Sequence, residues 1–144
     1  MADPPTINVS GQWHGGMKFA FEDGHGHHLI VDAPDNEGDP FEGFMPAYLL
    51  LASLAACTGI DIANILRKQR QELASLQIKV SGVQEPVAPW AFKEIRLEYA
   101  LQGKLDQRAV QRAIQLAEDK YCSIGATISK VAAITSSHTI SSQA

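Results

Sequence analysis

The sequence predicts an α+β protein in which antiparallel sheets surround one long central helix. Three observations carry this prediction: short alternating segments near the N-terminus, a long uncharged run, and a second alternating region followed by helical spacing. Alternation with a period of two is typical of strands that bury one face, whereas helices repeat every three to four residues. The predicted order, βββ-α-ββ-α-α-β, is that of helices packed against antiparallel sheets.

The first part of the chain predicts a three-stranded meander over residues 6–34. Apolar side chains occupy every second position from Met17 to Phe21. The glycine pair at 15–16 and the Asp-Gly pair at 23–24 are signals for hairpin turns. Residues 33–43 are rich in proline, glycine and aspartate, so they are predicted to form a loop.

The central helix is predicted over residues 46–71. It begins within the longest uncharged run of the sequence, Gly43 to Ile60, and Pro46 suits a first helical turn. At 1.5 Å per residue the helix is about 39 Å long, which matches the diameter of about 37 Å expected for a compact chain of this length. Its first half is apolar on every side and therefore needs cover, either from the rest of this chain or from a second chain.

A membrane span is the alternative interpretation of the same run. Its length meets the lower limit for a transmembrane helix. However, Ser53, Thr58 and Gly59 dilute its apolar character, and Asp61 follows within one turn. We therefore predict a buried core helix and no membrane partner.

The second half of the chain predicts a half-buried hairpin over residues 75–102, helices over 106–131 and a last strand over 133–140. Asp106 is a plausible N-cap for the first of these helices. A chain of 144 residues is long enough to bury a core of its own. We expect a single domain over residues 1–144.

Composition excludes some classes of function. The net charge is −4 and no long basic run is present, so nucleic acid is not an expected partner. The N-terminus has neither the basic start nor the apolar run of a secretory signal, which predicts a cytoplasmic protein. In that compartment two cysteines are more often catalytic, redox-active or simply buried than joined in a permanent bridge.

The two cysteines, Cys57 and Cys122, both lie on predicted helices. Each could be a small buried hydrophobe. A cysteine attacks only as the thiolate, and the apolar neighbours of Cys57, with Asp61 one turn on, oppose ionisation. A reactive Cys57 would therefore need a cation from elsewhere in the fold.

The histidine-rich turn, GHGHH at residues 24–28, is the one local pattern that suggests a metal. His25 and His27 would share a strand face, but no cysteine or carboxylate completes a ligand set nearby. We predict a solvated turn and no metal site.

Two stretches resemble the OsmC/Ohr family of osmotically inducible and organic hydroperoxide resistance proteins. The stretch PAYLLLASLAACTGIDIANILRKQR resembles the central helix of that family, with its Pro-x-x-Leu-Leu…Ala-Ala-Cys pattern. The stretch AEDKYCSIGATISKVAAIT resembles the segment that carries the second cysteine, and its Tyr-Cys-Ser form is similar to the OsmC-like subgroup. The two motifs together are specific, and with the order of strands the resemblance covers nearly the whole chain.

The resemblance implies an intertwined homodimer with two sites at the interface, and an antioxidant thiol peroxidase of the stress response. Cys57 would attack an organic hydroperoxide and become a sulfenic acid, and Cys122 would condense with it to a disulfide. An external dithiol, of the lipoyl type for example, would restore both thiols, and no bound cofactor is expected.

The chain departs from the family pattern at the residues that activate the thiolate. The peroxidases use an arginine from the early strands and a glutamate just after the proline. Here no arginine precedes Arg67, and Ala47 and Tyr48 follow Pro46. Tyr48 could supply a hydrogen bond. The candidates for the missing positive charge are Lys18, His14, His27 and His28.

Two further functions stay open at this point. An OsmC-fold dimer that has lost efficient peroxide reduction could instead bind a small apolar ligand at its interface. A purely structural or stress-associated dimer is the third option. The cysteine pair favours the peroxidase, whereas the missing arginine and glutamate favour the ligand-binding protein.

Overall fold

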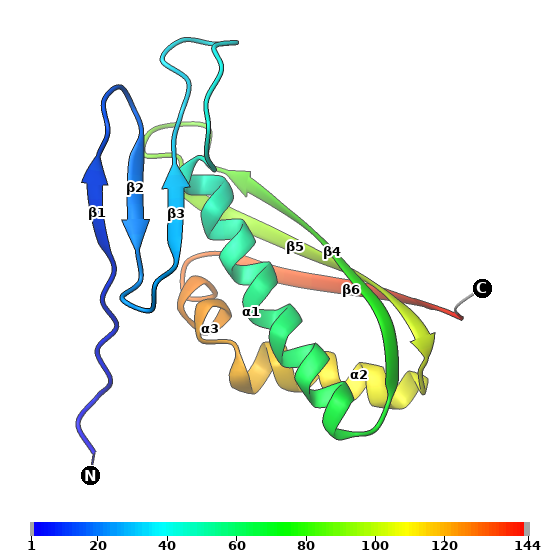
Figure 1. Cartoon of the computed structure of the whole chain (residues 1–144). Helices are drawn as coiled ribbons and strands as arrows, with labels where there is room; N and C mark the ends of the chain where they lie inside the picture. Colours follow the sequence, from blue (N-terminus) through cyan, green and yellow to red (C-terminus); the bar gives the residue numbers. More distant parts are fainter. Residues whose placement is uncertain (1, 143–144) are drawn as a thin grey trace. The chain divides into compact units, whose positions relative to one another are not determined.

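The computed structural model describes residues 2–142 and confirms the α+β class (Figure 1). The chain divides into two compact units, one up to Leu49 and one from Leu50 onwards, and each is described by itself. The first unit holds one small sheet and the start of the long helix. The second holds the rest of that helix, a second sheet and the remaining helices.

The first unit contains an antiparallel sheet in the order β1-β2-β3. Its strands are β1 (Ser10–Trp13), β2 (Phe19–Glu22) and β3 (His28–Val31). Gly15 and Gly16 both have positive φ angles in the first turn, a conformation that glycine adopts without strain.

Asp32 organises the loop that follows β3. Its buried carboxylate accepts hydrogen bonds from the backbone N–H of Ala33, at 2.8 Å, and of Glu42, at 2.9 Å. These two bonds tie the end of the strand to the end of the loop, across ten residues rich in proline, glycine and aspartate. A loop of that composition is therefore held at both ends before the long helix begins.

The long helix is α1 (Pro46–Lys68). Leu54, Ile62 and Leu66 are fully buried on the face that packs in the core of the second unit. Gly59 lies where a strand approaches closely, because a Cβ there would come 2.7 Å from Cδ1 of Ile78. Among residues 2–142, α1 is the one helix long and apolar enough to cross a membrane, but its buried face belongs to this core.

The helix ends at Lys68, three residues before the predicted Gln71. The backbone N–H of Gln71 bonds to the carbonyl of Leu66 at 2.9 Å, and that of Arg70 bonds to Arg67 at 3.0 Å. Arg70 has a φ angle of 58°. This is a Schellman ending, which normally carries glycine at the left-handed position, so the sequence held no signal for it.

Replacing Arg70 with glycine should therefore stabilise the protein by about 1 kcal/mol, because glycine adopts the left-handed conformation without strain. The measurement is the free energy of unfolding in urea. Lys68→Gly, inside the last helical turn, is the matched control and should cost about 1 kcal/mol. Equal destabilisation by both substitutions would contradict the assigned helix ending.

The second unit contains a mixed sheet in the order β4-β5-β6. Its strands are β4 (Glu72–Gln84), β5 (Phe92–Lys104) and β6 (Ala133–Ser141). The hairpin of β4 and β5 is antiparallel as expected, but β6 pairs with β5 in parallel. The expectation of antiparallel sheets alone was wrong, because the helical connection between β5 and β6 is long enough to form a crossover to the same end of the sheet.

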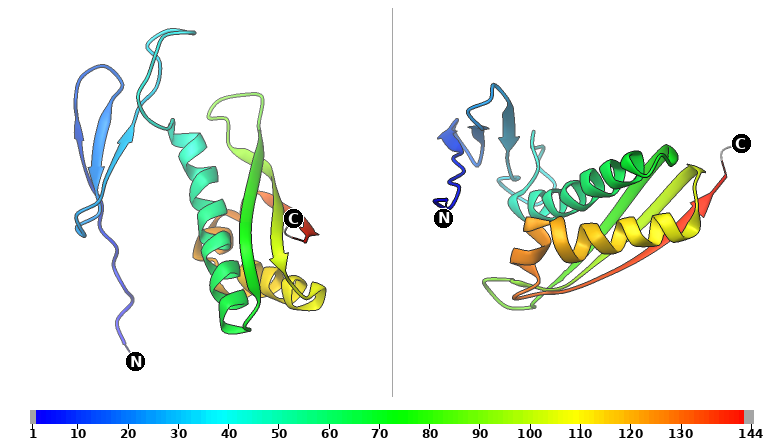
Figure 2. Two further views of the ribbon diagram at one scale, coloured as in Figure 1. Left: turned by 45° about the vertical axis from the view of Figure 1, so that its right-hand side comes forward. Right: turned by 90° about the horizontal axis from the view of Figure 1, so that it is seen from below.

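That connection contains α2 (Gln107–Leu116), a π-helical turn η1 (Ala117–Tyr121) and α3 (Ser123–Ile128). Asp106 caps α2 as predicted, since its Oδ2 accepts from the backbone N–H of Ala109 at 2.9 Å. Figure 2 shows α1 and α2 on the same face of the sheet. The crossover therefore brings Cys122, between η1 and α3, back toward α1.

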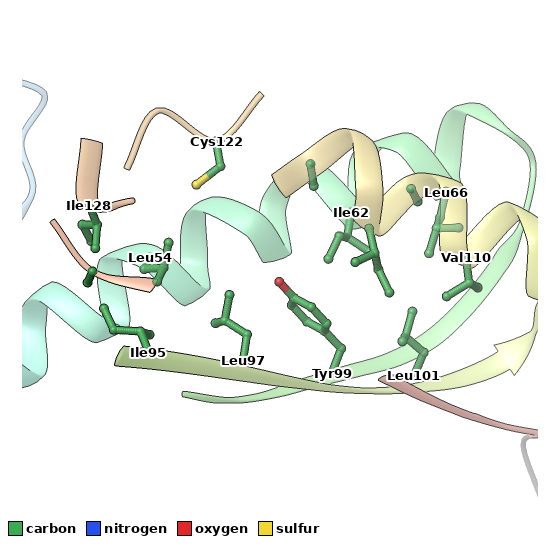
Figure 3. Packing of buried hydrophobic residues seen from close by; sticks show 14 residues of the cluster. Leu54, Ile62, Leu66, Ile95, Leu97, Tyr99, Leu101, Val110, Cys122 and Ile128 are labelled. Carbon is green, nitrogen blue, oxygen red and sulfur yellow. The ribbon is translucent and has the colours of Figure 1, made fainter. Parts of the chain in front are cut away.

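Alternate residues of β5 form the floor of the core beneath these helices. Ile95, Leu97, Tyr99 and Leu101 are all buried and point from the strand toward the helices (Figure 3). The neighbouring positions on the strand face the other way and are more exposed. The period-two pattern read from the sequence is thus the pattern that places Tyr99 opposite α1.

One side of α1 remains uncovered within the second unit. Leu50 is 40% exposed and Ile60 is 69% exposed. Cys57 follows Leu50 by seven residues and precedes Ile60 by three, so the three side chains share one helical face. We call this face, Leu50, Cys57 and Ile60, the exposed stripe of α1.

Candidate active site

Cys57 belongs to the exposed stripe of α1. Its side chain is half-buried, and it also packs against the hydrophobic core. Helical spacing places it on the side of the stripe next to the core face, three residues after the buried Leu54.

Cys122 is buried at the junction between η1 and α3, with 3% of its surface exposed. It is the N-cap of α3, and its Sγ accepts from the backbone N–H of Gly125 at 3.2 Å. The sulfur points toward α1 near Leu54 (Figure 3). Gly125 lies against the sulfur, because a Cβ built at that position would come 3.4 Å from it, an ordinary van der Waals contact.

The two thiols, 65 positions apart in the sequence, meet in the folded chain. Both are free, and their side chains lie close enough for Cys57 to affect the ionisation of Cys122. Burial, together with the neighbouring Cys57 thiol, raises the pKa of Cys122 to about 11. Cys122 is therefore a protonated thiol at neutral pH.

A second polar group lies beside the cysteines and was missed from the sequence. The hydroxyl of Tyr99 donates to Oε1 of Glu118 at 2.9 Å and lies beside the Thr58 hydroxyl. Burial raises the pKa of Tyr99. Thr58 follows Cys57 directly, and Glu118 lies on the π-helical turn before Cys122, so this network joins the segments that carry the two thiols.

Little in the sequence could have identified that network. Tyr99 occupies an inward position of a strand and reads as an ordinary core residue. Glu118 lies after the apolar stripe of a helix, and helical spacing does not indicate that a π-helical turn begins at Ala117. Such turns are often found at functional sites, but they carry no reliable sequence signal.

A pocket of about 450 Å³ lies within the second unit and reaches Cys122. Its floor is apolar and includes Leu54, Leu97 and Ile134. Its polar lining includes Glu118, Asp119, Ser129 and Lys130. We call it the Cys122 pocket, since Cys122 lines it and Cys57 does not.

The candidate activating residues of the first unit have partners there. Nζ of Lys18 pairs with Oε2 of Glu42 at 3.2 Å. Nδ1 of His27 lies 2.7 Å from Oδ2 of Asp23.

Asp23 also shapes the histidine-rich turn. Its Oδ1 accepts from the backbone N–H of His25 at 2.7 Å and of His27 at 3.2 Å. These bonds, that of His25 foremost, lower the pKa of Asp23 to about 2. The turn is closed by this aspartate, and no group of three metal-binding side chains occurs in the part of the chain that the structure describes.

The other three candidates, His14, His28 and Tyr48, also belong to the first unit, and His28 begins β3. The backbone N–H of His14 bonds to the carbonyl of Lys18 at 2.8 Å, which closes the hairpin. Tyr48, in the first turn of α1, is 62% exposed.

Comparison with known proteins identifies the family. A family model described as OsmC-like protein matches residues 36–137, which is more than half of the chain and includes both cysteines. The chain belongs to the OsmC-like protein family. Protein YhfA of Escherichia coli K12 is 32% identical over 130 residues, covering 90% of this chain and 94% of YhfA.

Solved structures with the same fold extend this relationship. A protein from Aquifex aeolicus VF5 has a TM-score of 0.87 at 24% identity, covering 98% of this chain and 100% of its own. The organic hydroperoxide resistance protein OhrB of Bacillus subtilis has a TM-score of 0.62 at 19% identity, covering 93% and 98%. These likenesses show the OsmC/Ohr-like fold that the sequence predicted.

The raised pKa of Cys122 predicts how this OsmC-like protein reacts with alkylating agents. In a Cys57→Ser variant, alkylation of Cys122 by iodoacetamide should stay slow through pH 9 and rise only as pH approaches 11, because burial still keeps the thiol protonated. The measurement is the rate of alkylation against pH by mass spectrometry. A rate that reaches its plateau below pH 8 would contradict the buried, protonated thiol.

Proposed function

We propose that this OsmC-like protein is a cytoplasmic thiol peroxidase that reduces organic hydroperoxides through a cycle of two cysteines. The observation that carries the proposal is that the fold brings the side chains of Cys57 and Cys122 close together. Neighbouring thiols need little movement to form a disulfide. The fold shared with a protein named for organic hydroperoxide resistance supports the same chemistry.

The environments of the two cysteines support different roles. Cys122 is buried and protonated, so it is poorly suited to the first attack. Cys57 is half-buried on the exposed stripe of α1, so it is the thiol that a hydroperoxide can reach first. These environments support Cys57 as the attacking residue and Cys122 as the residue that closes the disulfide.

The proposed cycle is balanced in atoms and electrons. The Cys57 thiolate attacks the terminal oxygen of ROOH, the O–O bond breaks, and the alkoxide takes a proton to leave as ROH. Cys57 is then a sulfenic acid. The Cys122 sulfur attacks it, the S–O bond breaks, and the released hydroxide takes the Cys122 proton to form water. A dithiol reduces the resulting disulfide and is itself oxidised.

A homodimer belongs to the same proposal. The exposed stripe of α1 is apolar, and cover for it from a second copy would also enclose the approach to Cys57. Obligate interfaces of this kind bury on the order of 2,000 Å² or more.

The proposal is tested by following cumene hydroperoxide and its alcohol product in the presence of dihydrolipoamide. We expect catalytic turnover that depends on the protein. The alternative, an apolar ligand held at the interface, is favoured by the missing arginine and glutamate. It would be supported if cumyl alcohol binds to the protein while hydroperoxide is not consumed.

A further inference from the structure

We infer that the Cys122 pocket is the binding site for the reductant, and that a thiol on a slender arm enters it to attack the sulfur of Cys122. This inference rests on the proposed two-cysteine cycle and adds a separate route to it. Hydroperoxide would reach Cys57 over α1, whereas the reductant would reach Cys122 from the opposite side of the cysteine pair.

The first support is geometric. The pocket is formed by the second unit alone, and its lining includes Cys122 but not Cys57. A volume of about 450 Å³ is within the range of ordinary ligand pockets. Although only 3% of its surface is exposed, Cys122 is one of the residues that line this pocket.

The second support is the chemistry of the lining. Leu54, Leu97 and Ile134 offer an apolar floor to an alkyl arm, while Ser129 and Lys130 can bond to a polar end. The Glu118 carboxylate, already held by the Tyr99 hydroxyl, lies in the same lining. It can accept the proton that an incoming thiol must lose before it attacks. A dithiol of the lipoyl type has an arm of this kind.

The third support is the order in which the sulfurs leave. Disulfide exchange is faster when the departing thiol has a lower pKa, and Cys122 has a high one. If the reductant attacked Cys57, Cys122 would have to leave in the first step, which is intermolecular. If the reductant attacks Cys122, Cys57 leaves first and Cys122 leaves only in the second step. For a dithiol that second step is intramolecular and gains from the high effective concentration of the second thiol.

The steps balance as follows. The first thiol of the dithiol loses its proton and bonds to the Cys122 sulfur, the Cys57–Cys122 bond breaks, and Cys57 leaves as a thiolate that takes up this proton. The second thiol of the same molecule then loses its proton and attacks the sulfur of the first, and Cys122 departs as a thiolate that takes up the second proton. The dithiol leaves as a cyclic disulfide, and its two protons end on the two cysteines.

The test begins from the protein oxidised with diamide, so that it does not depend on peroxide activity. A brief reaction with 2-mercaptoethanol, a monothiol that cannot close a ring, is quenched in acid, and the peptides are mapped by mass spectrometry. We expect the mixed disulfide on Cys122 at least ten times more often than on Cys57. An excess on Cys57 would overturn the inference, as would failure of diamide to join the two cysteines.

A pair of variants tests the route itself. Ser129→Trp should fill the pocket and slow reduction of the disulfide by dihydrolipoamide at least tenfold, without slowing oxidation of Cys57 by hydroperoxide. Val131→Trp, exposed nearby but outside the lining, should change neither rate more than twofold. Equal reduction rates in the two variants would overturn the inference. Loss of peroxide oxidation in a protein that diamide still oxidises would instead reject the proposed function.

Discussion

Replacing Cys57 with serine should lower hydroperoxide consumption on the order of 1,000-fold, because a hydroxyl at this position cannot act as a thiolate nucleophile. Cys57 lies on the exposed stripe of α1 and is half-buried, whereas the other thiol, Cys122, is buried and less accessible to hydroperoxide. The measurement is the initial rate of loss of cumene hydroperoxide with dihydrolipoamide present. Near wild-type consumption by Cys57→Ser would contradict the assignment of the attacking residue.

Cys122→Ser is the matched control for that substitution. It keeps the attacking thiol but removes the partner that closes the disulfide, so the first oxidation should still occur. The sulfenic acid should then persist and be oxidised further to the sulfinic acid by excess hydroperoxide. Mass spectrometry of Cys57 after repeated additions distinguishes this progressive inactivation from the immediate loss expected in Cys57→Ser.

Replacing Ile60 with aspartate should weaken the proposed homodimer at least about 100-fold. Ile60 is 69% exposed within one chain, and the interface would bury it. Burying an unpaired carboxylate costs several kcal/mol, whereas in a free monomer the same aspartate would be solvated at little cost. The measurement is molar mass by light scattering across a dilution series at micromolar concentrations.

Val131→Asp is the control for the dimer, because Val131 is 80% exposed but lies between α3 and β6, outside the exposed stripe of α1. It should leave the molar mass unchanged. A wild-type protein that is monomeric throughout the series would reject the dimer outright. A dimer that Ile60→Asp leaves intact would place the interface away from the exposed stripe of α1.

The sequence predicted the elements that rest on periodicity. Alternation identified β5, and Asp106 was recognised as the cap of α2. The end of α1 was missed because Arg70 occupies a left-handed position that glycine usually marks. The parallel pairing of β6 was missed because strand direction depends on the path of the chain between strands, which alternation does not encode.

The candidate site was predictable only in part for similar reasons. Each cysteine could be found by its motif, but their contact joins residues from two helical segments and depends on the crossover after β5. The carboxylate of Glu118 that accepts from Tyr99 lies on η1, a π-helical turn that the sequence did not predict. No spacing rule applied to one segment reveals a pairing with another.

The most direct test of the two-cysteine cycle is the state of the thiols after one equivalent of cumene hydroperoxide. Peptide mass spectrometry of the reduced protein, treated without reductant and then alkylated, should find Cys57 and Cys122 joined in one disulfide within a single chain, with one molecule of cumyl alcohol formed. Two freely alkylated cysteines and unconsumed hydroperoxide would contradict the account.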